Sequence, residues 1–270
     1  MISPSLVVLL LILGAATGFA AGLLGIGGGM ILVPLLTIIF SHEGFPPAHI
    51  VHMAIATSLS IIFFTSMSSV YAHHKRGAIL WPVALLLIPG VIIGSWIGPI
   101  IAAGLNTRYL AGLFGVFVIF SALKMLKKKK PGSQVGNLPG AAGMTAAGLG
   151  IGTLSGLVGA GGGFITVPFL GWRGVRIHNA VATSAVMGFP IALSGTLSNI
   201  HQGWGIQSLP AGSLGFIFLP AMACVALTSV LSAPYGARMA HTMNVNQLRT
   251  TFAYLLLVLA GYMFWKAVTV

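Results

Sequence analysis

Long apolar stretches separated by short polar segments make up almost the whole chain. In the first half, the stretches cover residues 5–24, 29–40, 50–72, 79–101 and 105–126. In the second half, they cover residues 139–158, 163–171, 178–200, 208–234 and 246–266. Most of them approach the roughly 20 residues that an α-helix needs to cross the hydrocarbon core of a bilayer. The pattern therefore predicts an all-α polytopic membrane protein.

One strongly polar segment, at residues 127–138, separates the two sets of stretches. It begins with four consecutive lysines, Lys127 to Lys130. We therefore expect a first transmembrane repeat over 1–126, a basic linker over 127–138 and a second transmembrane repeat over 139–270. Each repeat would hold four full spans and one short glycine-broken segment, which makes 8 to 10 segments in total. The sequence leaves open whether the short segments, 29–40 and 163–171, cross the membrane or re-enter it.

A ten-residue motif occurs once in each half, at positions 134 residues apart. Residues 25–34, GIGGGMILVP, match residues 159–168, GAGGGFITVP. The triplet Ala56-Thr57-Ser58 likewise matches Ala182-Thr183-Ser184, and His52 matches His178. Because the matched motifs keep their order along the chain, the two halves have the appearance of a gene duplication.

Charged residues are few and almost all of one sign. The chain is 57% hydrophobic, which is more apolar surface than a soluble protein could cover. It has 13 Lys and Arg against one acidic residue, and the basic residues sit mainly at the ends of the apolar stretches. This placement is typical of the positive-inside pattern of membrane proteins. A nucleic-acid partner is not expected, because the chain has no soluble basic domain.

The positions of the basic residues also bear on topology. If each half crosses the membrane five times, all Lys and Arg residues except Arg108 and Lys266 fall on one side. An odd number of crossings turns the second half upside down relative to the first. We therefore expect inverted repeats, with both termini outside and the Lys127–Lys130 linker in the cytoplasm. The expected location is the plasma membrane of a bacterium or an archaeon.

The scarcity of reactive side chains excludes several classes of function. The single acidic residue, Glu43, provides no carboxylate pair for acid–base catalysis. The single cysteine, Cys224, excludes an intrachain disulfide and a paired-cysteine centre. We therefore expect a protein that is not an enzyme and that holds no cofactor and no metal ion.

The repeated glycine clusters are the first candidate binding site. A glycine run followed by proline interrupts a helix, and a helix that restarts there directs free backbone N–H groups and its positive dipole end at the break. Paired breaks in corresponding places of two halves indicate a transporter binding site. Close helix packing through small residues is the alternative interpretation. The candidate anion-binding residues are Gly27, Gly28, Gly29, Gly161, Gly162 and Gly163.

Hydroxyl and imidazole groups are the second set of candidates. The duplicated hydroxyls of Thr57, Ser58, Thr183 and Ser184 could donate to anion oxygens, or they could bond to a carbonyl of their own helix. His52 and His178 are candidates for proton coupling, with a capping or interfacial role as the alternative. Secondary candidates for a polar track lie further along the same stretches, at Ser66, Ser68, Ser194, Ser198 and Asn199.

The arrangement resembles the TauE/SafE sulfite exporter family, also called the 4-toluene sulfonate uptake permeases. The residues that carry the resemblance are 22–29 with Val33-Pro34, 156–163 with Val167-Pro168, and the two Ala-Thr-Ser triplets. The likeness covers essentially the whole chain. It implies eight spans built from a duplicated four-span unit. It also implies transport of sulfite, sulfonates, sulfoacetate or related small anions, often as export.

Together these features predict a secondary transporter of a small sulfur-containing anion that works by alternating access. The anion would bind at the glycine-rich breaks between the repeats. The expected partners are this small anionic substrate and the lipid bilayer, and the sequence leaves a homo-oligomer open. A passive anion channel is the alternative, and a membrane assembly or chaperone protein is a further one.

Overall fold

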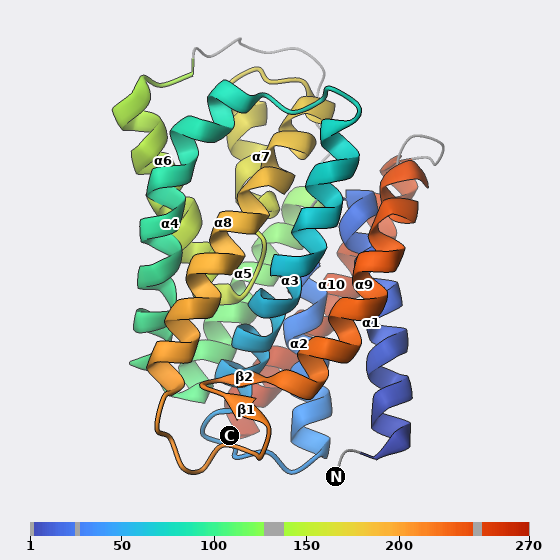
Figure 1. The fold of residues 1–270 in the computed structure, drawn as a ribbon, viewed down its shortest axis with the longest axis vertical. Helices are drawn as coiled ribbons and strands as arrows, with labels where there is room; N and C mark the ends of the chain where they lie inside the picture. Colours follow the sequence, from blue (N-terminus) through green and yellow to red (C-terminus); the bar gives the residue numbers. More distant parts are fainter. Residues whose placement is uncertain (1–2, 25–27, 127–137, 240–244, 270) are drawn as a thin grey trace.

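The structure is a computed structural model that describes residues 3–24, 28–126, 138–239 and 245–269. Its described segments form ten α-helices and one short β-hairpin (Figure 1). The helices of the first half are α1 (Pro4–Leu24), α2 (Gly29–His42), α3 (Ile50–His74), α4 (Trp81–Ala103) and α5 (Thr107–Leu126). Those of the second half are α6 (Ala141–Val158), α7 (Gly163–Trp172), α8 (Ile177–Gly203), α9 (Leu219–Met239) and α10 (Val245–Thr269).

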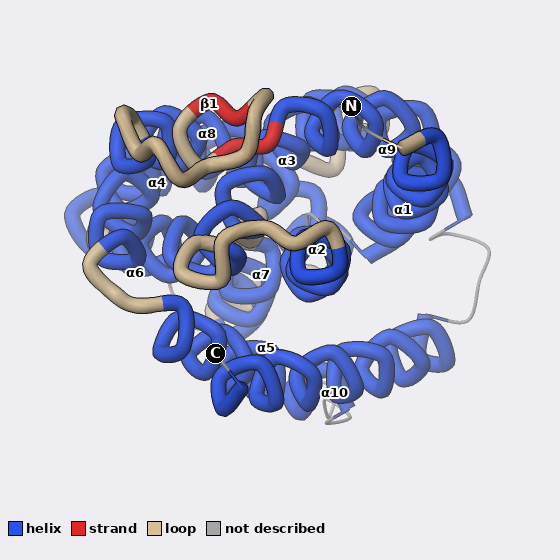
Figure 2. Tube along the Cα trace, turned by 90° about the horizontal axis from the view of Figure 1, so that it is seen from below, coloured by secondary structure: helices blue, strands red, loops and turns tan. Residues whose placement is uncertain are grey.

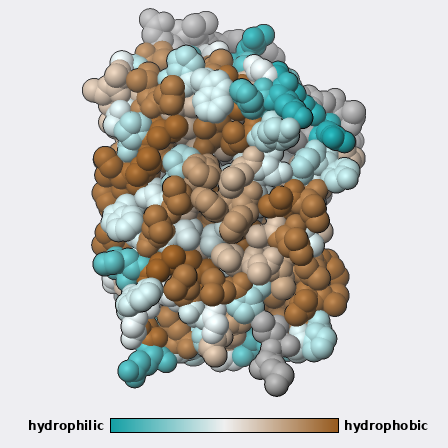
Figure 3. All heavy atoms as spheres, in the orientation of Figure 1, coloured by the Kyte–Doolittle hydropathy of each residue, from teal (hydrophilic) through white to brown (hydrophobic). Residues whose placement is uncertain are grey.

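Eight of the described helices are long and apolar enough to cross a membrane, and the two others, α2 and α7, are shorter apolar helices. Figure 3 shows apolar residues over most of the middle of one face, as a surface in contact with lipid requires. Large apolar side chains, among them Ile12, Val116 and Val258, are exposed on the outside of the bundle. The chain is therefore an integral membrane protein. The predicted all-α polytopic fold, with four long helices and one short helix in each half, is confirmed.

One predicted span begins later than the sequence indicated. The apolar stretch begins near residue 208, whereas α9 begins only at Leu219. The preceding residues form a β-hairpin, β1 (Ser213–Leu214) and β2 (Ile217–Phe218), in which Ser213 pairs with Phe218. The turn contains Gly215 at φ 56°, a backbone conformation that glycine adopts readily and most residues avoid. The hairpin corrects the expected start of this span.

Corresponding helices of the two halves run in opposite directions in Figure 1. Helix α3 ascends from the lower end, whereas α8 descends from the upper end. Both chain termini lie at the lower end, while α5 ends and α6 begins at the upper end. The inverted-repeat interpretation stays a prediction, and this arrangement is compatible with it.

The two halves are interlocked rather than set side by side. Helix α4 packs along α6, and α1 packs along α9, so each seam joins one helix from each half. Figure 2 shows α2 and α7 in the middle, with α5 and α10 together along one side. Gly90, Gly94 and Gly98 bring α4 against carbonyl oxygens of α6, and Gly14 and Gly18 bring α1 against α9. At these glycines the close-packing interpretation applies, because a side chain would collide with backbone atoms.

Basic residues of the described segments gather at the upper end of the bundle. The segments that join α3 to α4 and α7 to α8 lie there. They contain Lys75, Arg76, Arg173 and Arg176. Near the lower end, α5 and α10 contribute Arg108 and Lys266. The basic residues of these two connecting segments therefore share one end of the bundle.

Candidate functional site

Both glycine motifs break the chain in the same way. Gly28 precedes α2 with φ 68° and ψ −18°, and Gly162 precedes α7 with φ 75° and ψ −16°. This left-handed conformation favours glycine, because a Cβ would be strained there. The carbonyl oxygens of Gly28 and Gly162 accept the first hydrogen bonds of the new helices, at 2.9–3.1 Å. The repeated motif therefore encodes two equivalent helix restarts.

The two breaks touch each other inside the bundle. Gly29 lies so close to the other break that a Cβ would be 2.3 Å from the Gly159 carbonyl oxygen and 2.7 Å from the Ala160 Cα. Gly28, Gly29, Gly162 and Gly163 are all buried. From this meeting point α2 runs toward the lower end and α7 toward the upper end (Figure 1). The positive dipole ends of two helices therefore converge in the interior, where an anion is the favoured ligand.

The threonines of the duplicated Ala-Thr-Ser triplets connect the two halves. The backbone N–H of Phe218 donates to Thr57 Oγ1 over 3.1 Å, and the backbone N–H of Leu80 donates to Thr183 Oγ1 over 3.0 Å. Phe218 and Leu80 are the residues just before α9 and α4. Each threonine, fully buried, thus holds the start of a helix that belongs to the other half.

The serines of the two triplets both donate to backbone carbonyl oxygens. Ser58 Oγ donates to the Gly159 carbonyl oxygen over 2.9 Å, so this side chain reaches the second glycine break. Ser184 Oγ donates to the Val181 carbonyl oxygen of its own helix over 2.7 Å. Of the four predicted hydroxyls, Ser58 is the one whose bond to a break the described residues show.

We expect the threonine bonds to contribute to stability. Thr57→Val and Thr183→Val keep the side-chain volume but leave a buried backbone N–H at Phe218 and a partly buried one at Leu80 without an acceptor, which costs up to about 1–3 kcal/mol at each position. Each variant should therefore lower the thermal unfolding temperature of the detergent-purified protein. Thr269→Val is the control, because Thr269 is exposed and bonds only within the last turn of α10. Equal melting of the control and the two variants would contradict this role.

The predicted histidine pair lies in unequal surroundings. His52 is buried, its Nε2 lies 3.0 Å from the carbonyl oxygens of Ala102 and Leu105, and its ring stacks on Phe216. His178 is exposed at the start of α8. Neighbouring His49 lies just outside α3, and burial lowers its pKa below the usual value for histidine. The structure places His52 six residues before Ser58 on α3, which is about 9 Å along the helix axis.

Two parts of the predicted site lie outside the described residues. These are Gly27, in the first glycine break, and residues 127–137, which include the four lysines of the linker. The other candidate glycines, Gly28, Gly29, Gly161, Gly162 and Gly163, are described. Gly161 lines a cavity, and Gly28, Gly29, Gly162 and Gly163 form the restarts of α2 and α7.

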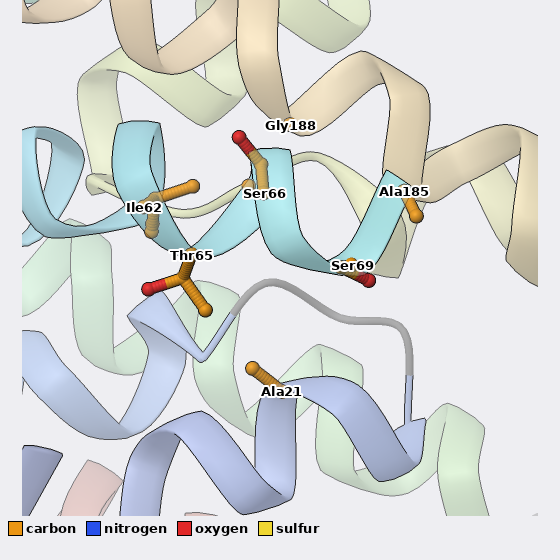
Figure 4. A pocket seen from close by; sticks show the side chains of 8 residues that line it. Ala21, Ile62, Thr65, Ser66, Ser69, Ala185 and Gly188 are labelled. Atoms are coloured by element: carbon orange, nitrogen blue, oxygen red, sulfur yellow. The ribbon is translucent and has the colours of Figure 1, made fainter. Parts of the chain in front are cut away.

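A small cavity of about 20 Å³ lies beside the breaks (Figure 4). It is lined by Ala21 of α1, by Ile62, Thr65, Ser66 and Ser69 of α3, by Gly161, and by Ala185 and Gly188 of α8. Sequence reasoning named Ser66 as a secondary candidate and missed Thr65 and Ser69. Their spacing at i, i+1 and i+4 puts them on one side of a helix, and that periodicity was the available signal.

Comparisons with known proteins agree on a family. The family model described as Sulfite exporter TauE/SafE matches residues 10–263. A probable membrane transporter protein of Haemophilus influenzae is 34% identical over 260 residues, which cover 96% of this chain and 98% of the relative. A probable membrane transporter protein of Methanocaldococcus jannaschii is 28% identical over 262 residues, which cover 94% of each chain. No solved structure matches the chain.

Proposed function

Because the chain belongs to the Sulfite exporter TauE/SafE family, we propose that it is a secondary transporter of a small sulfur-containing anion. Sulfite, sulfoacetate and other organosulfonates are the substrates in view, and export is the expected direction. The observation that carries the proposal is the contact between two buried helix restarts, at Gly29 and at Gly159-Ala160. In this proposal the protein is a transporter and not an enzyme.

The anion would be held by neutral groups. The backbone N–H groups at the glycine-rich starts of α2 and α7, from Gly27 to Gly29 and from Gly161 to Gly163, would donate to its oxygens. Ser58 would contribute from the side of α3, because it already bonds to the second break. Thr57, Thr183 and Ser184 are engaged with backbone groups, so they would reach a substrate only when those bonds open.

Transport would proceed by alternating access between the two halves. The oppositely running helices and the seams that join one half to the other support a movement of paired elements around the central breaks. A cavity of about 20 Å³ has room for about one water molecule and is too small for a sulfur oxyanion. In this proposal, a movement of one half relative to the other would enlarge the cavity to admit substrate.

The proposed orientation of the protein in the membrane rests on the distribution of its basic residues. The positive-inside rule would place the upper end of Figure 1 in the cytoplasm of a bacterial or archaeal plasma membrane, with both termini outside. Proton coupling through His52 and His178 remains part of the proposal. Burial of His52 beside the α4–α5 connection supports a structural role for it at least as well. A homo-oligomer stays open.

Flux measurements on the purified protein in liposomes test the proposal. We expect saturable uptake with counterflow for one sulfur anion in a panel of sulfite, sulfate, thiosulfate, sulfoacetate, taurine and chloride. An imposed pH gradient should accelerate this uptake if protons are coupled, and protein-free liposomes provide the background. Linear flux without counterflow would favour a passive channel. A wild-type protein that moves no sulfur anion would overturn the proposed function.

A further inference from the structure

We propose that three hydroxyl side chains of α3, those of Thr65, Ser66 and Ser69, bind the oxygen atoms of the transported anion. This assignment rests on the proposed function and adds a part of the binding site that the duplicated motifs do not contain. The ligand it implies is a compact oxyanion of about the size of sulfite.

The hydroxyl cluster lies directly beside a glycine break. Gly161 lines the same cavity, and a Cβ at Gly188 would lie 3.2 Å from the Ser66 Cβ and 3.8 Å from the Gly161 carbonyl oxygen. Figure 4 shows Thr65 pointing from α3 to the side of Ala21 on α1 and Ser66 pointing to the opposite side, toward Gly188 on α8, with Ser69 further along α3. Once a movement of the halves enlarges this space, an anion in it would contact hydroxyl groups and the start of the second break at once.

Ser69 has a hydroxyl available for a ligand. Its side chain is 93% buried, with 7% of its surface exposed, and it lines the cavity. No hydrogen bond of the Ser69 hydroxyl is shown within the described residues, and this hydroxyl can donate to an anion in the cavity.

The two neighbouring hydroxyls can be redirected at low cost. Ser66 Oγ donates to the Phe63 carbonyl oxygen over 3.0 Å, and Thr65 Oγ1 donates to the Ile61 carbonyl oxygen over 3.0 Å. Both acceptors belong to the same helix and can also take part in its backbone bonds, so losing the side-chain donor leaves them satisfied. Ser229 of α9 lies 3.0 Å from Thr65 Oγ1 and orients it.

The hydroxyl cluster breaks the symmetry between the halves. The matched triplets are 126 residues apart, and the same offset takes Thr65, Ser66 and Ser69 to Ile191, Ala192 and Gly195 on α8. None of these three residues carries a hydroxyl. The site is therefore one-sided: the glycine breaks come from both halves, but the side-chain donors come from α3. Ala21, Ala185 and Gly188 add only small apolar groups to the rest of the lining.

Sulfite transport by Ser66→Ala and Ser69→Ala variants in liposomes tests this assignment. Each removes one hydrogen bond to a charged ligand, so we expect the KM for sulfite to rise about 10- to 100-fold. Ser69→Thr keeps the hydroxyl and should stay within threefold of the wild type. The matched control is Ser60→Ala, because Ser60 is a buried serine of α3 that bonds to Thr57 and does not line the cavity.

A second readout separates binding from folding. Sulfite should raise the melting temperature of the detergent-purified wild type and of Ser60→Ala. It should not raise the melting temperature of Ser69→Ala. Without sulfite, Ser69→Ala should melt at the same temperature as the wild type. If the wild type transports sulfite and the alanine variants keep its KM, the hydroxyl assignment is wrong and the proposed function stands. If the wild type transports and binds no sulfur oxyanion, both are wrong.

Discussion

Replacing Gly29 by alanine is expected to reduce the rate of anion transport about 100-fold. The added Cβ would lie 2.3 Å from the Gly159 carbonyl oxygen, 2.7 Å from the Ala160 Cα and 2.9 Å from the Ile62 Cδ1. The first two are backbone atoms of the other break, so no change of side-chain rotamer relieves the collision. The two breaks would separate by roughly 1 Å, and misplacing binding groups by that distance can reduce a rate about 100-fold.

Liposome flux of the preferred sulfur anion measures this effect, with the amount of folded protein determined by size-exclusion chromatography. Gly150→Ala is the matched control, because Gly150 lies within α6 and a Cβ there meets nothing within 4 Å. That control should keep full flux and gain about 0.5–1 kcal/mol of stability, since alanine is the better helix former. Retention of wild-type flux by Gly29→Ala would show that the contact between the breaks has no part in transport.

Replacing Gly90 by leucine is expected to prevent the protein from folding. The Cβ alone would lie 1.9 Å from the Thr145 carbonyl oxygen and 2.7 Å from the Leu149 backbone nitrogen, both on α6. Overpacking of a close interface typically costs about 1–3 kcal/mol and more where backbone must move. A leucine here has to push two helices apart along a whole seam, so the penalty approaches the total stability of about 5–15 kcal/mol.

The α1–α9 seam allows an independent repetition of this test. A Cβ at Gly236 of α9 would lie 2.0 Å from the Phe19 carbonyl oxygen of α1, so Gly236→Leu should fail in the same way. The readouts are the yield of monodisperse protein after detergent extraction and the melting temperature. Gly261→Leu on α10 is the control, since nothing lies within 4 Å of its Cβ position. Normal yield of both seam variants would refute the close packing of the two halves.

The helices and their breaks could largely be predicted from the chain alone. The expected stretch 5–24 became α1 at Pro4–Leu24, and the expected break at the second glycine cluster separates α6 from α7 at Gly159 to Gly162. These features depend on local properties. A run of apolar residues enters lipid as a helix because its backbone bonds must be satisfied internally, and a glycine run ends that helix.

The β-hairpin before α9 could not be predicted from the same local properties. Residues 208–218 contain Leu214, Phe216, Ile217 and Phe218, so their hydropathy resembles the start of a span. The Phe216 ring stacks on His52 of α3, and the Phe218 ring contacts Phe40 and Phe45. These partners lie more than 150 positions away in the sequence. The apolar character of a segment does not show whether its side chains will contact lipid or distant aromatic residues of the same protein.

In the candidate site, too, some features could be predicted from the sequence and others could not. The repeated motif pointed to two glycine breaks, and their conformation and mutual contact agree with that interpretation. The motif did not show that Thr57 and Thr183 hold helix starts of the opposite half, nor that His52 is buried while His178 is exposed. Identical residue types in matched positions take different roles when the surrounding helices differ.

By itself, the sequence determined that this is an all-α membrane protein with a repeated glycine motif, and with four long helices and one short segment on each side of the linker. Those properties follow from composition and periodicity, which act over one or two helical turns. Only the tertiary structure decided that the two breaks touch, that the seams join opposite halves, and that Thr65, Ser66 and Ser69 face one cavity. Such contacts join residues that are far apart in the chain, and they depend on how closely each pair of helices can approach.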